Sequence, residues 1–151
     1  MTENSFTYVT YIATTPEKLW EALTCSKYTE QYFFGSTIQS DWHEGSQITY
    51  SRNGKVTDYG KILNVERNRV LSFTWTYVGD GVEGKQPSRV TFELTPMKET
   101  VKLTLRHENL QPGDLVDRDD TFEGLNNGWP AILSNLKSLL ETGKTLPAVS
   151  I

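Results

Sequence analysis

The chain has 151 residues, a net charge of −4 and a pI near 5.2. This balance argues against nucleic acid and anionic membranes as partners, because both require clustered Lys and Arg. No apolar run approaches the ~18 residues of a membrane span. The polar start of the chain lacks the layout of a signal peptide. The single cysteine excludes an internal disulfide. We therefore expect one cytoplasmic domain over residues 1–151, with its core at about residues 6–143.

The first part of the chain predicts a strand followed by two short helices. Residues 5–13 alternate as a strand does, and Thr14 or Thr15 can cap a helix that begins at Pro16. The apolar side of this helix contains Leu19, Trp20, Ala22 and Leu23. A second helix is predicted over about residues 26–33, capped by Ser26 and ended by Gly35. Its inward-facing side chains are Tyr28, Tyr32 and Phe33.

Six strands are predicted next, at about residues 36–41, 46–52, 56–65, 70–78, 88–96 and 100–108. Asn53 and Gly54 predict a type I′ hairpin, because both tolerate positive φ. Residues 96–99 make another tight connection, and residues 79–87 are expected to form one long, mobile hairpin loop. Together these segments predict an antiparallel meander, with the first strand completing an edge.

The end of the chain has the strongest helical stripe. Apolar side chains recur at three- and four-residue spacing, at Trp129, Ile132, Leu133, Leu136, Leu139 and Leu140. We expect this helix to begin near Asp119 or Asp120. Pro130 lacks the amide hydrogen that the helix needs, and Gly128 weakens the same turn, so a kink is predicted at residues 126–130. Such a kink would place Trp129 beside the mouth of any cavity.

Four segments resemble a known family. TTPEKLWEALT at residues 14–24 resembles the opening of the START-like, or SRPBCC, superfamily. GWP at residues 128–130, followed by Leu133, Leu136 and Leu140, is similar to the close of one of its branches. GKILNVE at residues 60–66 before LSFTW at 71–75, and TLRHENL at 104–110, agree with that branch. The branch resembles the C-terminal domain of the activator of the ATPase of the ninety-kilodalton heat-shock protein.

This resemblance implies an α+β protein with the helix-grip fold, β-α-α-β6-α, in which a curved antiparallel sheet wraps a long C-terminal helix around an internal cavity. Members are mostly single-domain bacterial proteins. Relatives across the superfamily bind lipids, polyketides, flavonoid-like molecules or hormones, and a few are cyclases or aromatases.

In this fold, alternation selects one inward face of the sheet. The inward positions are Ile48, Tyr50, Leu71, Phe73, Trp75, Tyr77, Val90, Phe92, Leu94, Val101, Leu103, Leu105 and His107. The outward positions are Thr74, Thr76, Arg89, Thr91, Lys102, Thr104 and Arg106. We predict that the ligand-binding residues are Ile48, Tyr50, Phe73, Trp75, Phe92, Leu103, Leu105, His107, Trp129 and Leu133. The alternative interpretation is that these side chains form an ordinary packed core.

His107 is the most informative polar residue, because it lies on the apolar face beside Leu105. It could orient a ligand oxygen or act as an acid or base, and the alternative is a histidine hydrogen-bonded to the backbone. His43 is expected on the surface, in a turn. Cys25 has no histidine nearby in the predicted strand order, and we expect it to be a small buried residue.

No metal, cofactor or catalytic residue is assigned. Five acids cluster before the last helix, at Asp114, Asp117, Asp119, Asp120 and Glu123, but their spacing does not match a calcium loop. We expect them to form a solvated helix start. The segment at residues 79–84 is glycine-rich but acidic, and therefore unsuited to phosphate.

Three functions are compatible with these patterns. The first is binding of a small hydrophobic ligand, aromatic, polyketide-like or lipid-like, with Tyr50 and His107 as orienting polar groups and Trp75 and Trp129 as flat walls. The second is a polyketide cyclase-like or hydratase-like enzyme, which needs a polar pair such as His107 with a carboxylate. The third, suggested by the family name alone, is a co-chaperone; it is the least supported, because the eukaryotic activators carry a further N-terminal domain.

Overall fold

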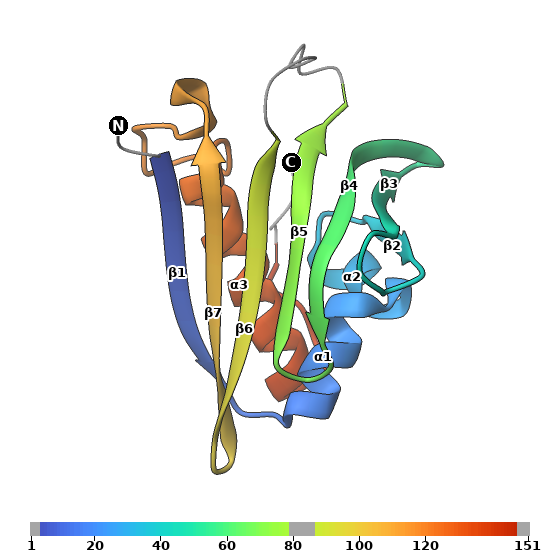
Figure 1. Cartoon of the computed structure of the whole chain (residues 1–151). Coiled ribbons are helices and arrows are strands. Elements are labelled where there is room, and N and C mark those ends of the chain that lie inside the picture. The colour runs from blue at the N-terminus through green and yellow to red at the C-terminus, as the bar shows by residue number, and fades with distance from the viewer. Residues whose placement is uncertain (1–3, 79–86, 148–151) are drawn as a thin grey trace.

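The computed structural model describes residues 4–78 and 87–147 of the chain. Figure 1 shows a curved sheet with the helices on one side of it. The strands are β1 (Asn4–Ile12), β2 (Thr37–Ser40), β3 (Gln47–Arg52), β4 (Lys55–Glu66), β5 (Val70–Tyr77), β6 (Ser88–Met97) and β7 (Thr100–Leu110). The helices are α1 (Pro16–Thr24), α2 (Ser26–Tyr32), the short 3-10 helix η1 (Pro112–Asp114) and α3 (Leu125–Thr142).

The seven strands form one antiparallel sheet in the order β1-β7-β6-β5-β4-β3-β2. Strands β2 to β7 therefore follow one another as a meander, and β1 closes the edge beside β7, as predicted. With two short helices after β1 and the long helix last, this is the helix-grip fold.

The predicted hairpin between β3 and β4 is confirmed. Arg52 pairs with Lys55, and Asn53 and Gly54 have φ angles of 54° and 78°, as a type I′ turn requires. Between β6 and β7 the turn lies at Lys98 and Glu99, with Met97 paired to Thr100. The predicted mobile loop at residues 79–87 falls on residues 79–86, which lie outside the described part of the chain.

The first helix begins where the sequence predicts. Thr15 caps α1 by accepting a hydrogen bond from the Lys18 amide at 3.2 Å, and Pro16 is the first helical residue. The predicted apolar side is buried: Leu19, Trp20, Ala22 and Leu23.

Two predictions about the second helix are wrong. The cap residue of α2 is Cys25, not Ser26, because the Ser26 hydroxyl instead joins both the amide and the carbonyl of Ile38, each at 2.9 Å. This ties the start of α2 to β2. Cys25 was expected to be buried and is exposed, because it lies in the link between α1 and α2.

The long helix begins at Leu125, so the prediction of a start near Asp119 or Asp120 is wrong. The Asn126 side chain bonds both the amide and the carbonyl of Val116 at 2.9 Å, which holds the preceding segment in a non-helical path. Gly124, with φ of 88°, turns the chain into the helix against Val116, where a Cβ atom would meet a methyl group at 2.7 Å. Pro130 lies inside α3; the kink stays a prediction.

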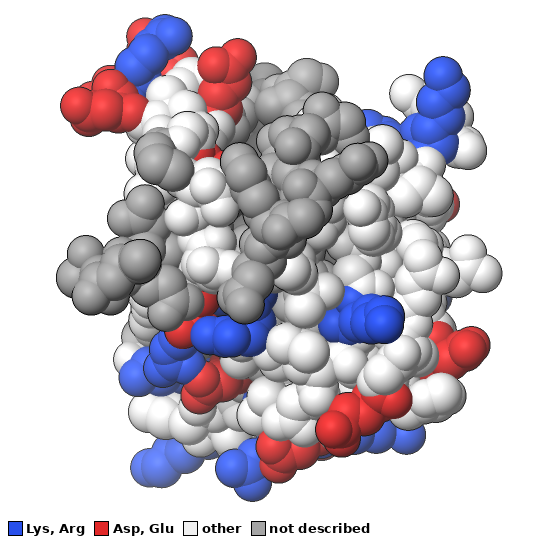
Figure 2. Space-filling view, turned by 45° about the horizontal axis from the view of Figure 1, so that its top comes forward, with Lys and Arg blue, Asp and Glu red and all other residues white. Residues whose placement is uncertain are grey.

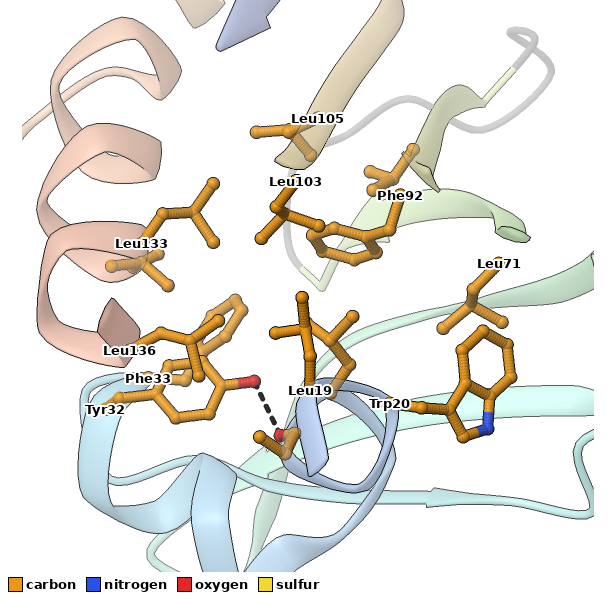
Figure 3. Close-up of a cluster of buried hydrophobic side chains, with 14 of the residues drawn as sticks. Leu19, Trp20, Tyr32, Phe33, Leu71, Phe92, Leu103, Leu105, Leu133 and Leu136 are labelled. Atoms are coloured by element: carbon orange, nitrogen blue, oxygen red, sulfur yellow. Dashed lines mark hydrogen bonds between the residues drawn. The ribbon is translucent and has the colours of Figure 1, made fainter. Parts of the chain in front are cut away.

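The core lies between the sheet and the three helices. In Figure 3, Leu103 and Leu105 of β7 face Leu133 and Leu136 of α3. All four are at most 1% exposed. Nearby, the Tyr32 hydroxyl donates a hydrogen bond to the Ala22 carbonyl at 2.8 Å, which joins α2 to α1.

The inward and outward faces largely follow the predicted alternation. One inward position differs: Tyr77 is 57% exposed, because it lies at the end of β5. Trp75 faces inward as predicted but is only partly buried. One outward residue, Thr104, is buried rather than solvated, since β1 and β6 flank it on both sides.

Candidate functional site: an aromatic cluster between the sheet and helix α3

Seven ring side chains meet between the sheet and α3. This ring cluster consists of Phe33, Tyr50, Phe73, Trp75, Phe92, His107 and Trp129. The Tyr50 ring lies 5.0 Å from Phe33 and 4.9 Å from Trp75, and Trp129 lies 5.6 Å from Trp75. Its members come from β3, β5, β6, β7, α3 and the end of α2, so only the tertiary fold assembles it.

The cluster brings together six of the ten predicted site residues. These are Tyr50, Phe73, Trp75, Phe92, His107 and Trp129. The other four are fully buried aliphatic side chains of the core: Ile48, Leu103, Leu105 and Leu133. The predicted set therefore divides into a ring-rich part and a purely aliphatic part.

His107 is hydrogen-bonded on both sides of its ring. The Trp129 indole N–H donates to Nδ1 at 3.0 Å, and Nε2 lies 2.8 Å from the Ser88 hydroxyl. The Ser88 hydroxyl in turn donates to the carbonyl of Trp75 at 2.9 Å. The alternative interpretation, a histidine hydrogen-bonded to the backbone, is thus wrong, since the side chains of Ser88 and Trp129 bond both ring nitrogens.

This chain of hydrogen bonds assigns the tautomer of His107. An indole N–H can only donate, so Nδ1 must accept and the ring proton lies on Nε2, facing Ser88. Burial lowers the pKa of His107 from 6.5 to about 4. Protonation of Nδ1 would also place its N–H against the Trp129 indole N–H, and the hydrogen bond between the two rings would be lost. His107 is therefore neutral near pH 7 and positions Trp129.

A buried carboxylate interacts with the second indole of the cluster. Asp58 lies on the inward face of β4, 8% exposed, and accepts a hydrogen bond from the Thr57 hydroxyl at 2.8 Å. Burial raises the pKa of Asp58, while hydrogen bonds from Thr57 and Trp75 and the charge of Arg52 oppose that rise. The indole N–H of Trp129 has its acceptor in His107, and the indole of Trp75 interacts with Asp58, so the two rings present mainly apolar surface.

The Tyr50 hydroxyl differs from these groups. Tyr50 is 3% exposed, and burial raises the pKa of its hydroxyl well above 10.0, with Tyr32 and Asp58 adding to the rise. Across residues 4–78 and 87–147, no hydrogen bond of this hydroxyl is found. A neutral hydroxyl thus lies among the rings with its hydrogen-bonding capacity unused.

Solvent reaches the cluster at Trp75. The other six rings are at most 6% exposed, whereas Trp75 is partly exposed near the end of β5. On the face shown in Figure 2, acidic and basic side chains lie next to one another around mostly uncharged surface.

Metal ligands are not grouped anywhere in the described part of the chain. The acidic segment before α3 is used locally instead. Asp114 accepts a hydrogen bond from the Gln111 amide at 2.7 Å, and Asp120 pairs with Arg118 at 3.0 Å. His43 is exposed in a turn, as predicted.

Three residues of the site were missed from the sequence. Phe33 was expected to face inward but was not assigned to the site, and Asp58 and Ser88 were not considered. Alternation along β4 could have found Asp58, because it shares a face with the buried Gly60 and Ile62. Ser88 precedes Val90 by two residues and so shares its inward face, which gives the same signal.

The fold and this interior define a helix-grip protein with an aromatic-rich layer between the sheet and the last helix. The chain belongs to the family described as Activator of Hsp90 ATPase homolog 1-like protein, which matches residues 13–141. No curated protein matches it by sequence. In the described residues, no helix is long and apolar enough to cross a membrane.

Solved structures agree with this assignment. ChR145 from Cytophaga hutchinsonii is 29% identical, with a TM-score of 0.71, and the match covers 93% of this chain and 96% of that one. An HSP90 activator from Plasmodium falciparum is 23% identical over 90% and 95% of the two chains, with a TM-score of 0.69. DynU16, from the dynemicin biosynthetic locus, is 21% identical over 95% and 49%, with a TM-score of 0.70. The last two support the fold alone.

Proposed function

We propose that this protein binds a small, largely apolar molecule with aromatic rings at the ring cluster. The observation that carries the proposal is the pairing of flat apolar surfaces with one unused polar group. The Trp129 N–H is bonded to His107, the Trp75 indole interacts with the buried Asp58, and the Tyr50 hydroxyl has no partner among the described residues. Rings favour stacked and edge contacts with other rings, and a single hydroxyl can orient the bound molecule.

Binding must exchange ring–ring contacts for ring–ligand contacts, because the cluster's side chains now touch one another. The stacked contact of Phe33 with Trp75, at 6.1 Å, is the natural one to exchange, since Trp75 is the partly exposed member. His107 and Ser88 hold Trp129 from behind, so that wall keeps its orientation.

The rival hypothesis of a cyclase or hydratase requires His107 paired with a carboxylate. His107 instead contacts Ser88 and Trp129, and Glu108 lies on the outer face, where it pairs with Arg89 at 3.2 Å. A histidine whose pKa is about 4 is also a weak base near pH 7. We therefore propose binding rather than catalysis. The hypothesis of a chaperone partner rests on the family name and on relatives such as the Plasmodium activator.

The test is an NMR titration of nitrogen-labelled protein with flavonoids, fatty acids and aromatic polyketides. The chain has four tryptophans, and two of them, Trp20 and Trp42, lie outside the ring cluster and serve as internal controls. We expect the indole signals of Trp75 and Trp129 to shift with an aromatic ligand while those of the controls stay in place. If no compound moves any indole signal, the proposal fails and a protein partner becomes the better hypothesis.

A variant pair separates binding from stability. Trp129→Leu should weaken binding of the best ligand by at least about tenfold, because it removes one wall of the cluster. Trp20→Leu also removes a buried indole, but from α1, and should leave affinity within about twofold. Calorimetric titration measures both affinities and thermal denaturation measures both stabilities. Equal losses of affinity in the two variants would show that Trp129 is ordinary core.

A further inference from the structure

Two buried polar atoms have no hydrogen-bond partner in the described part of the chain: the Ser36 hydroxyl oxygen and the Arg52 Nε. Ser36 is 1% exposed. An unpartnered buried donor costs about 1–3 kcal/mol, so such groups are uncommon in folded proteins. Each can donate a hydrogen bond, and an unused donor can be satisfied by an acceptor from outside the described residues.

The two residues that carry these atoms are neighbours by the register of the sheet. Strand β2 pairs with β3 so that Ile38 is opposite Tyr50 and Thr37 opposite Ser51. The same register continued by one residue brings Ser36 beside Arg52. Ser36 shares the inward face of Ile38, and Arg52 shares that of Tyr50. The unused Tyr50 hydroxyl belongs to this same inward surface.

Ring contacts connect Arg52 to the ring cluster. The Arg52 guanidinium lies 6.0 Å from the centre of the Phe34 ring, and Phe34 lies 6.5 Å from Phe33, a member of the cluster. We name Ser36, Tyr50 and Arg52 the donor end of the cluster. A molecule stacked on the rings would thus have donors within reach at one end.

The backbone beside the donor end is held in a strained shape. Phe34 has a φ of 49°, a left-handed conformation that is unfavourable for a bulky side chain, and Gly35 follows with φ of 75°. The Thr29 hydroxyl donates to the Ser36 carbonyl at 2.8 Å and helps to hold this turn. Strained residues of this kind concentrate at functional sites, because the surrounding structure must maintain them.

Asp58 contributes to the charge of the donor end without occupying it. Its charge attracts Arg52, but no ion pair between them within 4.0 Å is found in residues 4–78 and 87–147. Its hydrogen bond goes instead to the Thr57 hydroxyl, and it also interacts with the Trp75 indole. The guanidinium therefore keeps its donors available while part of its charge is compensated.

We propose that the donor end receives an oxygen acceptor of the ligand, a carboxylate or a carbonyl, through Arg52, Ser36 and Tyr50. This inference rests on the proposed function, since the ligand's rings must first occupy the ring cluster. The ligand class then narrows from aromatic molecules in general to ring systems that end in a carboxylate or a carbonyl group. Hydrogen bonds from a guanidinium to such an oxygen are among the stronger ones in proteins.

The test compares three probes that share one ring system: naphthoate, its methyl ester and naphthalene. We expect naphthoate to bind at least about tenfold more tightly than naphthalene, the effect of one charge-assisted hydrogen bond. Arg52→Met retains an apolar side chain but has no hydrogen-bond donors. In this variant the affinity for naphthoate should exceed that for naphthalene by less than about threefold, while the affinity for naphthalene itself is unchanged. Ser36→Ala should reduce the same advantage by a smaller factor.

Lys55→Met is the matched control, because Lys55 is the exposed cation opposite Arg52 in the same hairpin and should retain the full advantage. Equal affinity of the unaltered protein for naphthoate and naphthalene would show that the donor end does not receive the ligand's oxygen. The proposed function would still stand. Binding of none of the three probes would instead refute the proposed function. If the methyl ester also binds more tightly than naphthalene, the acceptor is a carbonyl group. If only naphthoate binds more tightly than naphthalene, the acceptor is a carboxylate.

Discussion

The layer between the sheet and α3 has two chemically different halves. The aliphatic half contains Leu19, Leu71, Leu103, Leu133 and Leu136, all at most 1% exposed and without a polar side-chain atom. The ring half contains the seven ring side chains and, bonded to them or beside them, Ser88, Asp58 and the donor end. The first half has no polar side-chain group for a ligand, whereas the second has polar groups without a partner among the described residues. The proposed function therefore assigns stability and recognition to different locations in one layer.

The largest expected effect tests the aliphatic half. Leu136→Ala should lower the free energy of unfolding by about 3 kcal/mol, because it leaves a cavity where α3 packs on the sheet. Ligand affinity should remain within about twofold. Urea denaturation measures the first and calorimetric titration the second. Leu63→Ala, at a residue of β4 that is 40% exposed, is the matched control and should change stability by less than about 1 kcal/mol. A large loss of affinity in Leu136→Ala would show that the two halves are not separate.

The next effect is a pH dependence that belongs to the ring half. The pKa of His107 is about 4 in the folded protein and near 6.5 when exposed, so the unfolded chain binds more protons between these values. The stabilisation is complete above pH 6.5 and is lost as pH falls towards 4. Between pH 7 and pH 5 the loss should be about 2 kcal/mol.

Urea denaturation at both pH values measures this contribution as a difference between variants, because other groups titrate as well. His107→Gln should be about 2 kcal/mol less sensitive to this change of pH than the unaltered protein. His43→Gln alters an exposed histidine and should retain the full sensitivity. The same pH dependence in all three proteins would contradict the buried, neutral His107.

The smallest expected effect compares two buried tyrosines. Tyr32→Phe removes a hydroxyl that bonds the Ala22 carbonyl and should cost about 1 kcal/mol of unfolding free energy. Tyr50→Phe removes a hydroxyl without a partner among the described residues and should change stability by less than about 0.5 kcal/mol. Only Tyr50→Phe should reduce ligand affinity. Thermal denaturation and calorimetric titration of the pair decide this, and the reverse ranking of stabilities would contradict an unused Tyr50 hydroxyl.

Local patterns predicted most of the fold because they depend on neighbours in the chain. Thr15 and Pro16 at the start of α1, and Asn53 and Gly54 between β3 and β4, act within a few residues. The predictions that failed concern groups whose partners lie farther away. Ser26 bonds Ile38 instead of capping α2, and Asn126 bonds Val116 and delays the start of α3. A side chain with two competing partners cannot be assigned from its neighbours alone.

The sequence by itself determined the family, the meander of strands and the inward position of Tyr50, Trp75, His107 and Trp129, because alternation and helical spacing are local periodicities. Only the tertiary structure decided how these residues are used. It joined His107 of β7 to Ser88 of β6 and Trp129 of α3, and among the described residues it left the buried donors of Ser36 and Arg52 without acceptors. The reason is physical: a hydrogen bond depends on distance and direction between atoms far apart in the chain, and no residue pattern records either.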